Sequence, residues 1–432
     1  MSQHTGPTAG PDPSTMSIPA NQRSFHVMAK PGSSICNIDC KYCYYLSKEV
    51  LAGGPGGGRM SDEVLERYIK EYIDGVTARE VVFSWQGGEP TLLGLPYFKK
   101  IAALQKKHRK STQKISNDLQ TNGTLLDEEW CKFLKDEEWL VGLSIDGPRE
   151  MHDAYRVTKN GKPTFDLVMR GVELLNRFEI PFNTLTCVNR LNAKHPKEVY
   201  RFLRQEVRSA YMQFIPIVEY KTFERQAPQM WDPATLPIDG TPQARPGHPD
   251  SIVVDWSVDP DDYGEFLCGV FDEWHANDVG KVLVNHFETL VAQHVGLPSQ
   301  LCIYSSACGK GLAIEHDGSV YSCDHYVYPE YKLGNVKDKN LRAMVFSPTQ
   351  VKFGIDKRAT LPKYCRECSF LSDCWGECPK NRIIRTPDGE PGLNYLCRGL
   401  KKYFAHAIPK VEEIAAGLRQ VRIDPSKRMQ GR

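Results

Sequence analysis

Residues 36–43 read CNIDCKYC, which places the three cysteines Cys36, Cys40 and Cys43 in the spacing CxxxCxxC. A β-rich run ends just before this motif, so we expect the motif on a loop that leaves a strand. Three soft thiolate ligands this close together can hold three irons of a 4Fe–4S cube and leave the fourth iron open. A zinc site is the alternative, although zinc normally takes four ligands and CxxC-type pairs.

Short β-rich runs alternate with helical patterns from residue 24 to about residue 218. The expected strands are Phe25–Met28, Val81–Trp85, Ile115–Gln120, Leu140–Ile145, Phe182–Val188 and Met212–Ile217. The expected helices are Asp62–Ile73, Tyr97–Lys107, Glu128–Leu134, Phe165–Phe178 and Pro196–Glu206. Strict alternation predicts an α/β fold with a parallel sheet and right-handed crossovers. A curled sheet of this kind is a partial (βα)6 barrel, whose chemistry lies at the carboxyl ends of the strands.

Three loops follow consecutive strands at that same end. They read GGEP at residues 87–90, TNG at residues 121–123 and DGP at residues 146–148. Each is a turn by composition, but together they are candidate site loops. An open iron can be chelated by the amino and carboxylate groups of S-adenosylmethionine, and electron transfer then releases a 5′-deoxyadenosyl radical. The GGEP loop beside the three-cysteine motif favours this radical chemistry over zinc.

Composition excludes several classes of protein. The 432 residues suggest two or three domains, and 55 Lys and Arg against 53 Asp and Glu give a formal net charge of +2. This balance argues against a nucleic-acid partner. No stretch approaches the ~18–20 apolar residues of a membrane helix. The polar N-terminal segment has no apolar secretory core, so we expect a cytoplasmic protein with a disordered leader at residues 1–23.

The 14 cysteines are an unusual number for a chain without a secretory signal. A disulfide framework is not expected there, so the clustered thiols point to metal. Beyond the first motif, eight thiols lie in one later region: Cys302, Cys308, Cys323, Cys365, Cys368, Cys374, Cys378 and Cys397. The scattered Cys131, Cys187 and Cys268 are expected to be small buried hydrophobes.

We expect five segments: the leader, the barrel at residues 24–220, an insertion and helical pair at 221–300, the Cys-rich region at 301–400, and a C-terminal helix with a basic tail at 401–432. Residues 227–259 are dense in Pro and Asp and predict an irregular insertion or flexible linker. The later expected helices are Tyr263–Asn277, Val282–Val295 and Tyr403–Val421.

The sequence resembles the radical S-adenosylmethionine superfamily and, within it, the anaerobic sulfatase-maturating enzymes. The stretches that carry this resemblance are FSWQGGEPTL at 83–92, LQTNGTL at 119–125, VGLSIDGP at 141–148, and DGSVY at 317–321 followed by Cys323 and Asp324. The resemblance covers about Phe25–Glu219 and Asp262–Val411, and it fails over the Pro-rich insertion and at both termini.

The resemblance implies that Cys36, Cys40 and Cys43 hold the radical-generating cluster. The implied contacts to S-adenosylmethionine are Tyr42, Gly88, Ser144, Arg156 and, as an apolar contact to the adenine, Val218. A hydroxyl and a guanidinium are both suited to donate to a carboxylate.

The Cys-rich region resembles the SPASM extension of this family, which carries two auxiliary 4Fe–4S clusters. Eight thiols match full ligation of two cubes by four cysteines each. The resemblance implies one set of Cys302, Cys308, Cys323 and Cys378 and a second set of Cys365, Cys368, Cys374 and Cys397. A pair of zinc knuckles is the alternative. The implied cofactors are therefore three 4Fe–4S clusters and S-adenosylmethionine.

The implied reaction oxidises a Cys or Ser side chain of a sulfatase precursor to Cα-formylglycine. Asp324 is the candidate base, and the nearby auxiliary cluster is the candidate electron acceptor. An unfolded precursor peptide would dock extended in the cleft between barrel and extension, with Gln86, Asn122 and Tyr45 as wall residues. The implied electron donor is a reductant such as flavodoxin or ferredoxin, and the balanced charge permits a monomer.

Two other functions stay open on the sequence alone. One is a related maturase that forms a thioether link or epimerises a residue in a ribosomally made peptide. The other is a non-catalytic iron–sulfur or zinc protein that acts in electron transfer or binding. The second gives no reason for a three-cysteine loop beside a GGEP turn. The sequence does not distinguish a Cys target from a Ser target.

Overall fold

A ten-stranded sheet forms the centre of the computed structural model, which describes residues 24–45 and 58–423. Six neighbouring strands of this sheet are parallel and follow one another in chain order, as expected for a partial α/β barrel. These strands are β1 (His26–Lys30), β3 (Glu80–Trp85), β4 (Lys114–Thr121), β5 (Leu140–Ser144), β7 (Phe182–Val188) and β8 (Tyr211–Pro216). The predicted fold class is confirmed.

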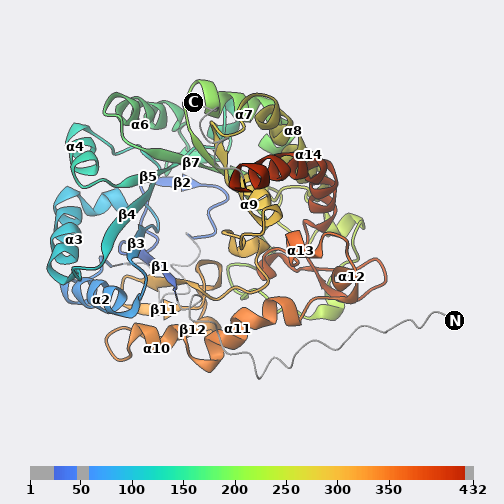
Figure 1. The fold of residues 1–432 in the computed structure, drawn as a ribbon. Helices are drawn as coiled ribbons and strands as arrows, with labels where there is room; N and C mark the ends of the chain where they lie inside the picture. The colour runs from blue at the N-terminus through green and yellow to red at the C-terminus, as the bar shows by residue number, and fades with distance from the viewer. Residues whose placement is uncertain (1–23, 46–57, 424–432) are drawn as a thin grey trace.

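The helices between these strands lie on the outside of the curved sheet (Figure 1). They are α2 (Asp62–Gly75), α3 (Leu95–His108), α4 (Glu128–Asp136), α6 (Phe165–Arg177) and α7 (Pro196–Gln205), together with the short α5 (Arg149–Asp153). Each of the six strands and five long helices agrees with its expected range to within two residues at either end. Hydrophobic periodicity therefore locates the barrel well.

Side chains along β3 point alternately to the outer helical layer and to the interior of the barrel. Phe83 and Trp85 are fully buried and point to the helical layer, where their rings meet Tyr68 and Tyr72 of α2. The intervening residues face the other way, because side chains alternate along a strand. The carboxyl-terminal loop of β3 thus reaches the interior of the barrel, where Gln86 lines a cavity.

The Cys-rich region continues the barrel sheet, an arrangement the sequence did not predict. Strand β10 (Gly311–Glu315) pairs parallel with β1, and β11 (Ser319–Tyr321) and β12 (Lys332–Asn335) add antiparallel strands beyond it. Without β10, the first barrel strand would be an unpaired edge. The pairing joins two parts of the chain that lie almost 300 residues apart, so no local pattern reveals it.

The opposite edge corrects one expected helix. Residues 282–295 were expected to be helical throughout, but β9 (Leu283–Val284) pairs parallel with β8 before α9 (Asn285–His294) begins. Pairing with β8 decides this, and periodicity over two residues cannot show it.

Residues 227–259 have irregular backbone with two short 3-10 helices, at Pro233–Thr235 and Pro242–Ala244. Contacts hold the segment to the rest of the chain. Trp231 stacks on Tyr220 with ring centroids 5.3 Å apart, and the Tyr331 hydroxyl donates to the Pro228 carbonyl at 2.8 Å. The segment therefore covers part of the Cys-rich region.

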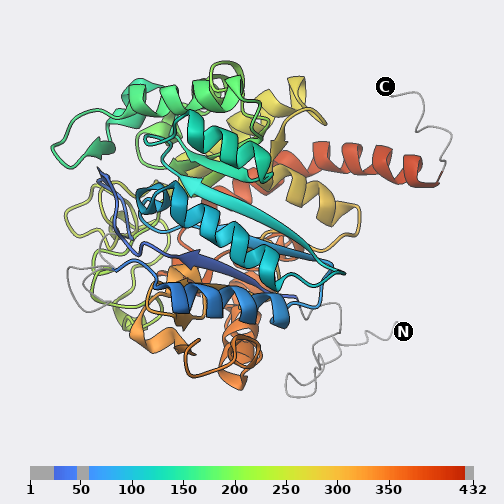
Figure 2. The ribbon, with the colours of Figure 1, turned by 90° about the vertical axis from the view of Figure 1, so that its left-hand side faces the viewer.

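The remaining elements are short apart from three longer helices. They are β2 (Ile38–Cys40), β6 (Arg156–Thr158), α8 (Pro260–Asn277), α10 (Leu341–Val345), α11 (Pro348–Ala359), α12 (Lys363–Arg366), α13 (Leu371–Cys374), β13 (Ile384–Arg385), β14 (Pro391–Leu393) and α14 (Cys397–Ile423). Figure 2 shows the red end of α14 projecting from the body of the molecule. Among the described residues, no helix combines the length and the apolar character needed to cross a bilayer. The expected leader lies outside the described residues.

Helix α14 begins at Cys397, six residues before the expected start at Tyr403. Its first turn is packed against α8 through two glycines. A Cβ on Gly399 would lie 2.0 Å from the Pro260 carbonyl oxygen and 2.8 Å from the Gly264 nitrogen. Glycine lowers helix propensity, so the local sequence does not predict a helix that begins at Cys397. Close packing of α14 against α8 stabilises this helix start.

We predict that Gly399→Ala lowers the stability of the protein, because a methyl group there forces α8 and α14 apart. Overpacking of this kind typically costs about 1–3 kcal/mol. Gly417→Ala in the same helix is the control, since its Cβ would meet no atom within 4 Å. Calorimetric melting should show a lower Tm for Gly399→Ala and an unchanged or higher Tm for Gly417→Ala. Equal melting of both variants would contradict the prediction.

Candidate active site

The three-cysteine motif lies at the carboxyl end of β1. Cys36 precedes β2, Cys40 is its last residue, and Cys43 follows. Strand β2 pairs antiparallel with β6, which sets Cys40 opposite Arg156. All three cysteines line one cavity of about 390 Å³ at the mouth of the barrel. Burial raises the pKa of the Cys36 thiol to about 11, so binding of a metal there must displace thiol protons.

The GGEP loop is bonded directly to the cysteine loop. The Gly88 N–H donates to the Ser33 carbonyl at 2.8 Å, and the Glu89 N–H donates to the Ile35 carbonyl at 2.8 Å. A Cβ on Gly88 would lie 2.1 Å from the Ile35 oxygen. Only glycine permits this approach of two backbones, which explains the residue type at position 88.

Glu89 joins the same loop to the end of β4. One carboxylate oxygen accepts from the Thr91 N–H at 3.0 Å and from the hydroxyls of Thr91 at 2.6 Å and Thr121 at 2.7 Å. The other oxygen accepts from the Asn122 N–H at 2.7 Å. Burial raises the pKa of Glu89, and these hydrogen bonds oppose the rise. The glutamate thus positions neighbouring loops.

The TNG loop reaches the cysteine motif through Asn122. Its side-chain amide donates to the Asn37 carbonyl oxygen at 2.9 Å and lies 3.9 Å from the Cys36 sulfur. Asn37 in turn donates to the Thr124 hydroxyl at 2.8 Å. Polar contacts therefore hold the first cysteine against the end of the neighbouring strand.

A buried ion pair lies beneath the cysteines. Arg156 Nε lies 3.0 Å from one Asp146 carboxylate oxygen, and its Nη2 donates to the other at 3.1 Å. The Tyr42 hydroxyl also donates to Asp146. Burial acts to lower the pKa of Arg156, but Asp146 together with Tyr42, Cys40 and Cys187 outweighs it and raises that pKa well above its usual value. The guanidinium stays charged, and its Nη1 lies 4.0 Å from the Cys40 sulfur.

Four of the five expected S-adenosylmethionine contacts line the cavity: Tyr42, Gly88, Ser144 and Arg156. Ser144 ends β5 and accepts a hydrogen bond from the Gln120 amide at 2.9 Å. Val218 does not line this cavity. It is 2% exposed within the hydrophobic core, while the adjacent Ile217 and Glu219 face the cavity.

Cys187 differs from its expected role. Cys131 and Cys268 are buried in the hydrophobic core, as expected of small hydrophobes. Cys187 instead lines the cavity, with its sulfur 3.8 Å from Arg156 Nη2. The expectation was wrong because alternation along β7 turns residue 187 toward the barrel interior.

Asp324 enters the cavity from the Cys-rich region and pairs with Lys30, the last residue of β1. The Tyr44 hydroxyl donates to its other carboxylate oxygen at 2.7 Å. Burial alone would raise the pKa of Asp324. The charges of Lys30 and His325 and the hydrogen bonds from Lys30 and Tyr44 outweigh this and lower the pKa to about 2. Asp324 is thus held as an ionised carboxylate close to the three-cysteine loop.

Lys30 also bridges Asp324 to a second carboxylate. Its ammonium lies 3.7 Å from the centroid of the Tyr45 ring, and the Tyr45 hydroxyl donates to Glu315 at 2.5 Å. The pairing of β1 with β10 sets Glu315 opposite Lys30. Neither Lys30 nor Glu315 was predicted as a site residue. In the sequence, a charged residue after an apolar run is interpreted as part of a loop, and only the strand pairing shows that these two lie side by side.

The first auxiliary cysteine set gathers beside Asp324. Burial raises the pKa of Cys323 well above its usual value, and the nearby Cys302 and Cys378 raise it further. Burial also raises the pKa of Cys308, and the nearby Cys302 raises it further. The Cys378 sulfur lies 3.7 Å from His325 Nδ1, and Cys378 lines the same cavity as the three-cysteine loop.

The second set lines a separate pocket. Its walls contain all four cysteines together with apolar side chains, among them Phe370, Leu371, Leu393 and Phe404. Four thiols around an apolar space suit the donor set of a cysteine-ligated 4Fe–4S cluster. Among the described residues, no three His, Cys, Asp or Glu side chains converge to hold a single metal ion. The zinc alternative therefore has no preformed single-ion site in that part of the chain.

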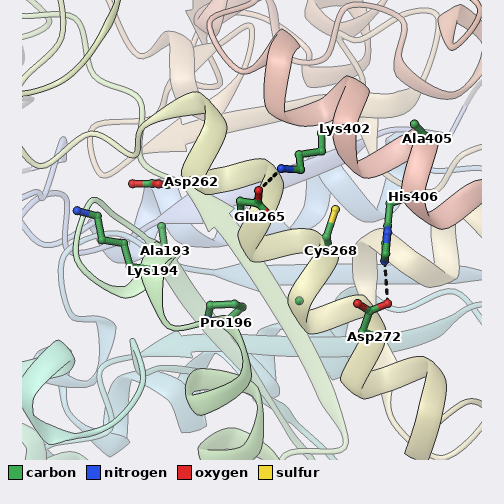
Figure 3. A pocket seen from close by; sticks show the side chains of 11 residues that line it. Ala193, Lys194, Pro196, Asp262, Glu265, Cys268, Asp272, Lys402, Ala405 and His406 are labelled. Atoms are coloured by element: carbon green, nitrogen blue, oxygen red, sulfur yellow. Dashed lines mark hydrogen bonds and ion pairs between the residues drawn. The ribbon is translucent and has the colours of Figure 1, made fainter.

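A larger groove of about 760 Å³ lies elsewhere, between the loop before α7, helix α8 and helix α14. Figure 3 shows two of its acidic side chains facing basic partners. Glu265 pairs with Lys402, and Asp272 accepts from His406 at 2.7 Å. Burial raises the pKa of Cys268 to about 11, so its thiol is a weak nucleophile. This groove contains none of the clustered cysteines.

Comparisons with known proteins show which families and structures this chain is similar to. The Radical SAM superfamily model matches residues 31–203, and the model of an iron–sulfur cluster-binding domain matches residues 302–369. A serine-type anaerobic sulfatase-maturating enzyme of Bacteroides thetaiotaomicron is 44% identical over 90% of this chain and 91% of that protein. A cysteine-type enzyme of Clostridium perfringens is 32% identical over 91% of this chain and 99% of that protein. The solved structure of native anSMEcpe with bound AdoMet and Cp18Cys peptide has a TM-score of 0.75 at 32% identity, and covers 91% of this chain and 99% of that chain.

We predict that Asp146→Asn strongly destabilises the protein, because it leaves Arg156 buried without a carboxylate. Removing one partner of a buried pair typically costs about 3–5 kcal/mol. Asp166→Asn is the matched control, since its pair with Arg149 is exposed and should change the unfolding midpoint little. Urea denaturation measures both variants. An unchanged midpoint for Asp146→Asn would show that the pair contributes little to stability.

Proposed function

This chain belongs to the anaerobic sulfatase-maturating enzymes of the radical SAM superfamily, and on that premise we propose which of its residues perform each part of the reaction. The enzyme oxidises a Cys or Ser side chain of a sulfatase precursor to Cα-formylglycine. One observation carries the residue assignment. The three-cysteine loop, the GGEP loop and Asp324 face a single cavity, although Asp324 lies more than 200 residues beyond the two loops in the sequence.

The enzyme uses three 4Fe–4S clusters and S-adenosylmethionine. We assign the radical-generating cluster to Cys36, Cys40 and Cys43, whose thiols share the cavity wall. When bound, this cluster and S-adenosylmethionine supply the 5′-deoxyadenosyl radical that abstracts hydrogen from the target. The auxiliary clusters go to the two sets of four: Cys302, Cys308, Cys323 and Cys378, and Cys365, Cys368, Cys374 and Cys397.

Four residues orient S-adenosylmethionine in this proposal. Arg156 offers its guanidinium to the carboxylate, and Ser144 offers its hydroxyl. The backbone at Gly88 meets the amino group, since the absence of a side chain leaves its carbonyl accessible. Tyr42 supports Arg156 from below through Asp146. Val218 lies behind Ile217, which makes Ile217 the better candidate for the apolar contact.

Asp324 takes the proton that the target residue loses. Two features support this role: the carboxylate faces the cavity, and Lys30 and Tyr44 fix both of its oxygens. Gln86 and Tyr45 line the same wall and hold the target side chain near Asp324, while Asn122 lines the wall beside Cys36. An ionised carboxylate is ready to accept a proton without prior rearrangement.

The substrate is a precursor peptide of a sulfatase, and we propose that it binds unfolded and extended. Leu301 and Ile303 form an apolar part of the cavity wall opposite the barrel strands. Glu219 and Lys380, paired at 2.8 Å, add a polar part. We further propose a flavodoxin or ferredoxin as reductant, a monomeric state and a cytoplasmic location, because thiols that build clusters need a reducing compartment.

We predict that replacing Cys36, Cys40 and Cys43 together with Ala removes about one third of the iron, because full cysteine ligation divides it among three clusters. Iron and sulfide assays after anaerobic reconstitution measure the loss. Replacing Cys131 and Cys268 with Ala is the control and should leave the iron unchanged. Unchanged iron in the triple variant, or zinc in place of iron, would refute the assignment.

We predict that Asp324→Asn lowers formylglycine formation by about 10²–10⁴-fold, the usual contribution of general-base catalysis. The variant should keep its iron and still cleave S-adenosylmethionine, because radical generation occurs at the other cluster. Mass spectrometry of peptides carrying a Cys or a Ser target follows the product. Asp338→Asn, an exposed position in the same region, is the control. A wild-type product rate from Asp324→Asn would place the base elsewhere.

A further inference from the structure

One face of helix α11 packs against the loops that carry the first auxiliary cysteine set. The Gln350 amide donates to the Gly309 carbonyl at 2.8 Å and to the Ser322 carbonyl at 2.9 Å. One turn later, a Cβ on Gly354 would lie 2.4 Å from the Cys308 oxygen. Lys357 follows after almost one more turn, so these three residues share a face of the helix. That face points at the loops that carry Cys302, Cys308 and Cys323.

Lys357 is an unusual member of this face because it is a buried cation. Its side chain is 1% exposed, and its ammonium donates to the Cys302 carbonyl at 2.6 Å and to the Ile303 carbonyl at 2.7 Å. Within residues 24–45 and 58–423, no carboxylate lies within ion-pair distance of this ammonium. Burying a charge without a counter-charge is costly. A structure that keeps such a lysine needs an anion near it.

The groups around Lys357 that can carry negative charge are thiols of the first set and the buried carboxylate of Glu377. Burial lowers the pKa of Lys357, and Cys302, Cys308, Cys378 and, after them, Glu377 oppose this effect. Other buried charges lie farther along the same region. Arg382 donates only to neutral oxygens, and Glu377 accepts from Asn381 and Asn394. Lys357 is therefore the cation with direct bonds to the first cysteine loop.

We propose that Lys357 is the counter-charge of the cluster held by the first cysteine set and that it raises the reduction potential of that cluster. This inference rests on the proposed ligand set and reaction. Oxidation of the target radical releases one electron and one proton; Asp324 would accept the proton, and a cluster held by this cysteine set would accept the electron. Reduction adds one negative charge to a site that already carries four thiolates. A fixed cation nearby favours the more negative state, and the effect is large where the dielectric is low.

Lys357→Met tests the proposal in the full chain after anaerobic reconstitution. Redox titration followed by EPR should show one of three midpoint potentials moved to a more negative value. We expect at least a tenfold change in the oxidised-to-reduced ratio at fixed potential, equivalent to 59 mV for a one-electron couple. Lys357→Arg keeps the charge and should restore the wild-type potential. Lys352→Met is the matched control, because Lys352 lies on the same helix with its side chain 73% exposed.

Each outcome decides the proposal. Unchanged potentials in Lys357→Met, with iron content intact, would overturn it. If Lys357→Met loses one cluster, recovery of that iron by Lys357→Arg supports the role of charge, and loss in both variants overturns it. Cys302→Ala identifies which signal belongs to the first set. Absence of that cluster or of formylglycine formation in the wild-type protein would instead refute the proposed function, so the two failures are distinguishable.

Discussion

The parallel pairing of β1 with β10 is the interaction on which the site depends. It sets Glu315 opposite Lys30 and brings Asp324, a few residues farther along the chain, to the end of the strand that leads into the cysteine motif. Without this pairing, the barrel would hold only the radical-generating half of the chemistry. The Cys-rich region would then have no fixed position relative to the target residue. Sheet hydrogen bonds are well suited to this task, because register fixes which side chains meet.

Several buried charges around the cavity are held by fixed polar partners. Asp146 holds Arg156, Glu89 holds the loop after β4, and Lys30 holds Asp324. Such groups are costly to bury unless they are fully bonded. Their benefit is positional: each fixes a donor or acceptor that faces the cofactor or the substrate. Lys357 departs from this rule: in the described part of the chain its ammonium donates to two backbone carbonyls and forms no ion pair, which is why we propose the cluster of the first cysteine set as its counter-charge.

Much of the barrel could be predicted from the sequence because its information is local. Apolar periodicity located the strands and helices, and the spacing of Cys36, Cys40 and Cys43 indicated an open-iron cluster. The prediction failed where a contact from a distant segment decides the outcome. Leu283 and Val284 become a strand because β8 lies beside them, and α14 starts early because Gly399 packs on α8. Cys187 faces the cavity because alternation along β7 turns it inward, and Val218 lies in the core while its neighbour Ile217 lines the cavity.

The sequence by itself determined the chemistry of this protein: which residue types can ligate iron, where the site loops follow the strands, and which family the motifs resemble. These are properties of neighbours along the chain, where residue type and spacing are enough. Only the tertiary structure decided which charges meet. It placed Lys30 between Asp324 and Glu315, Asp146 under Arg156, and Lys357 against the Cys302 loop. These contacts join residues that lie from 10 to almost 300 positions apart, and they form only when sheet register and helix packing have fixed the backbone.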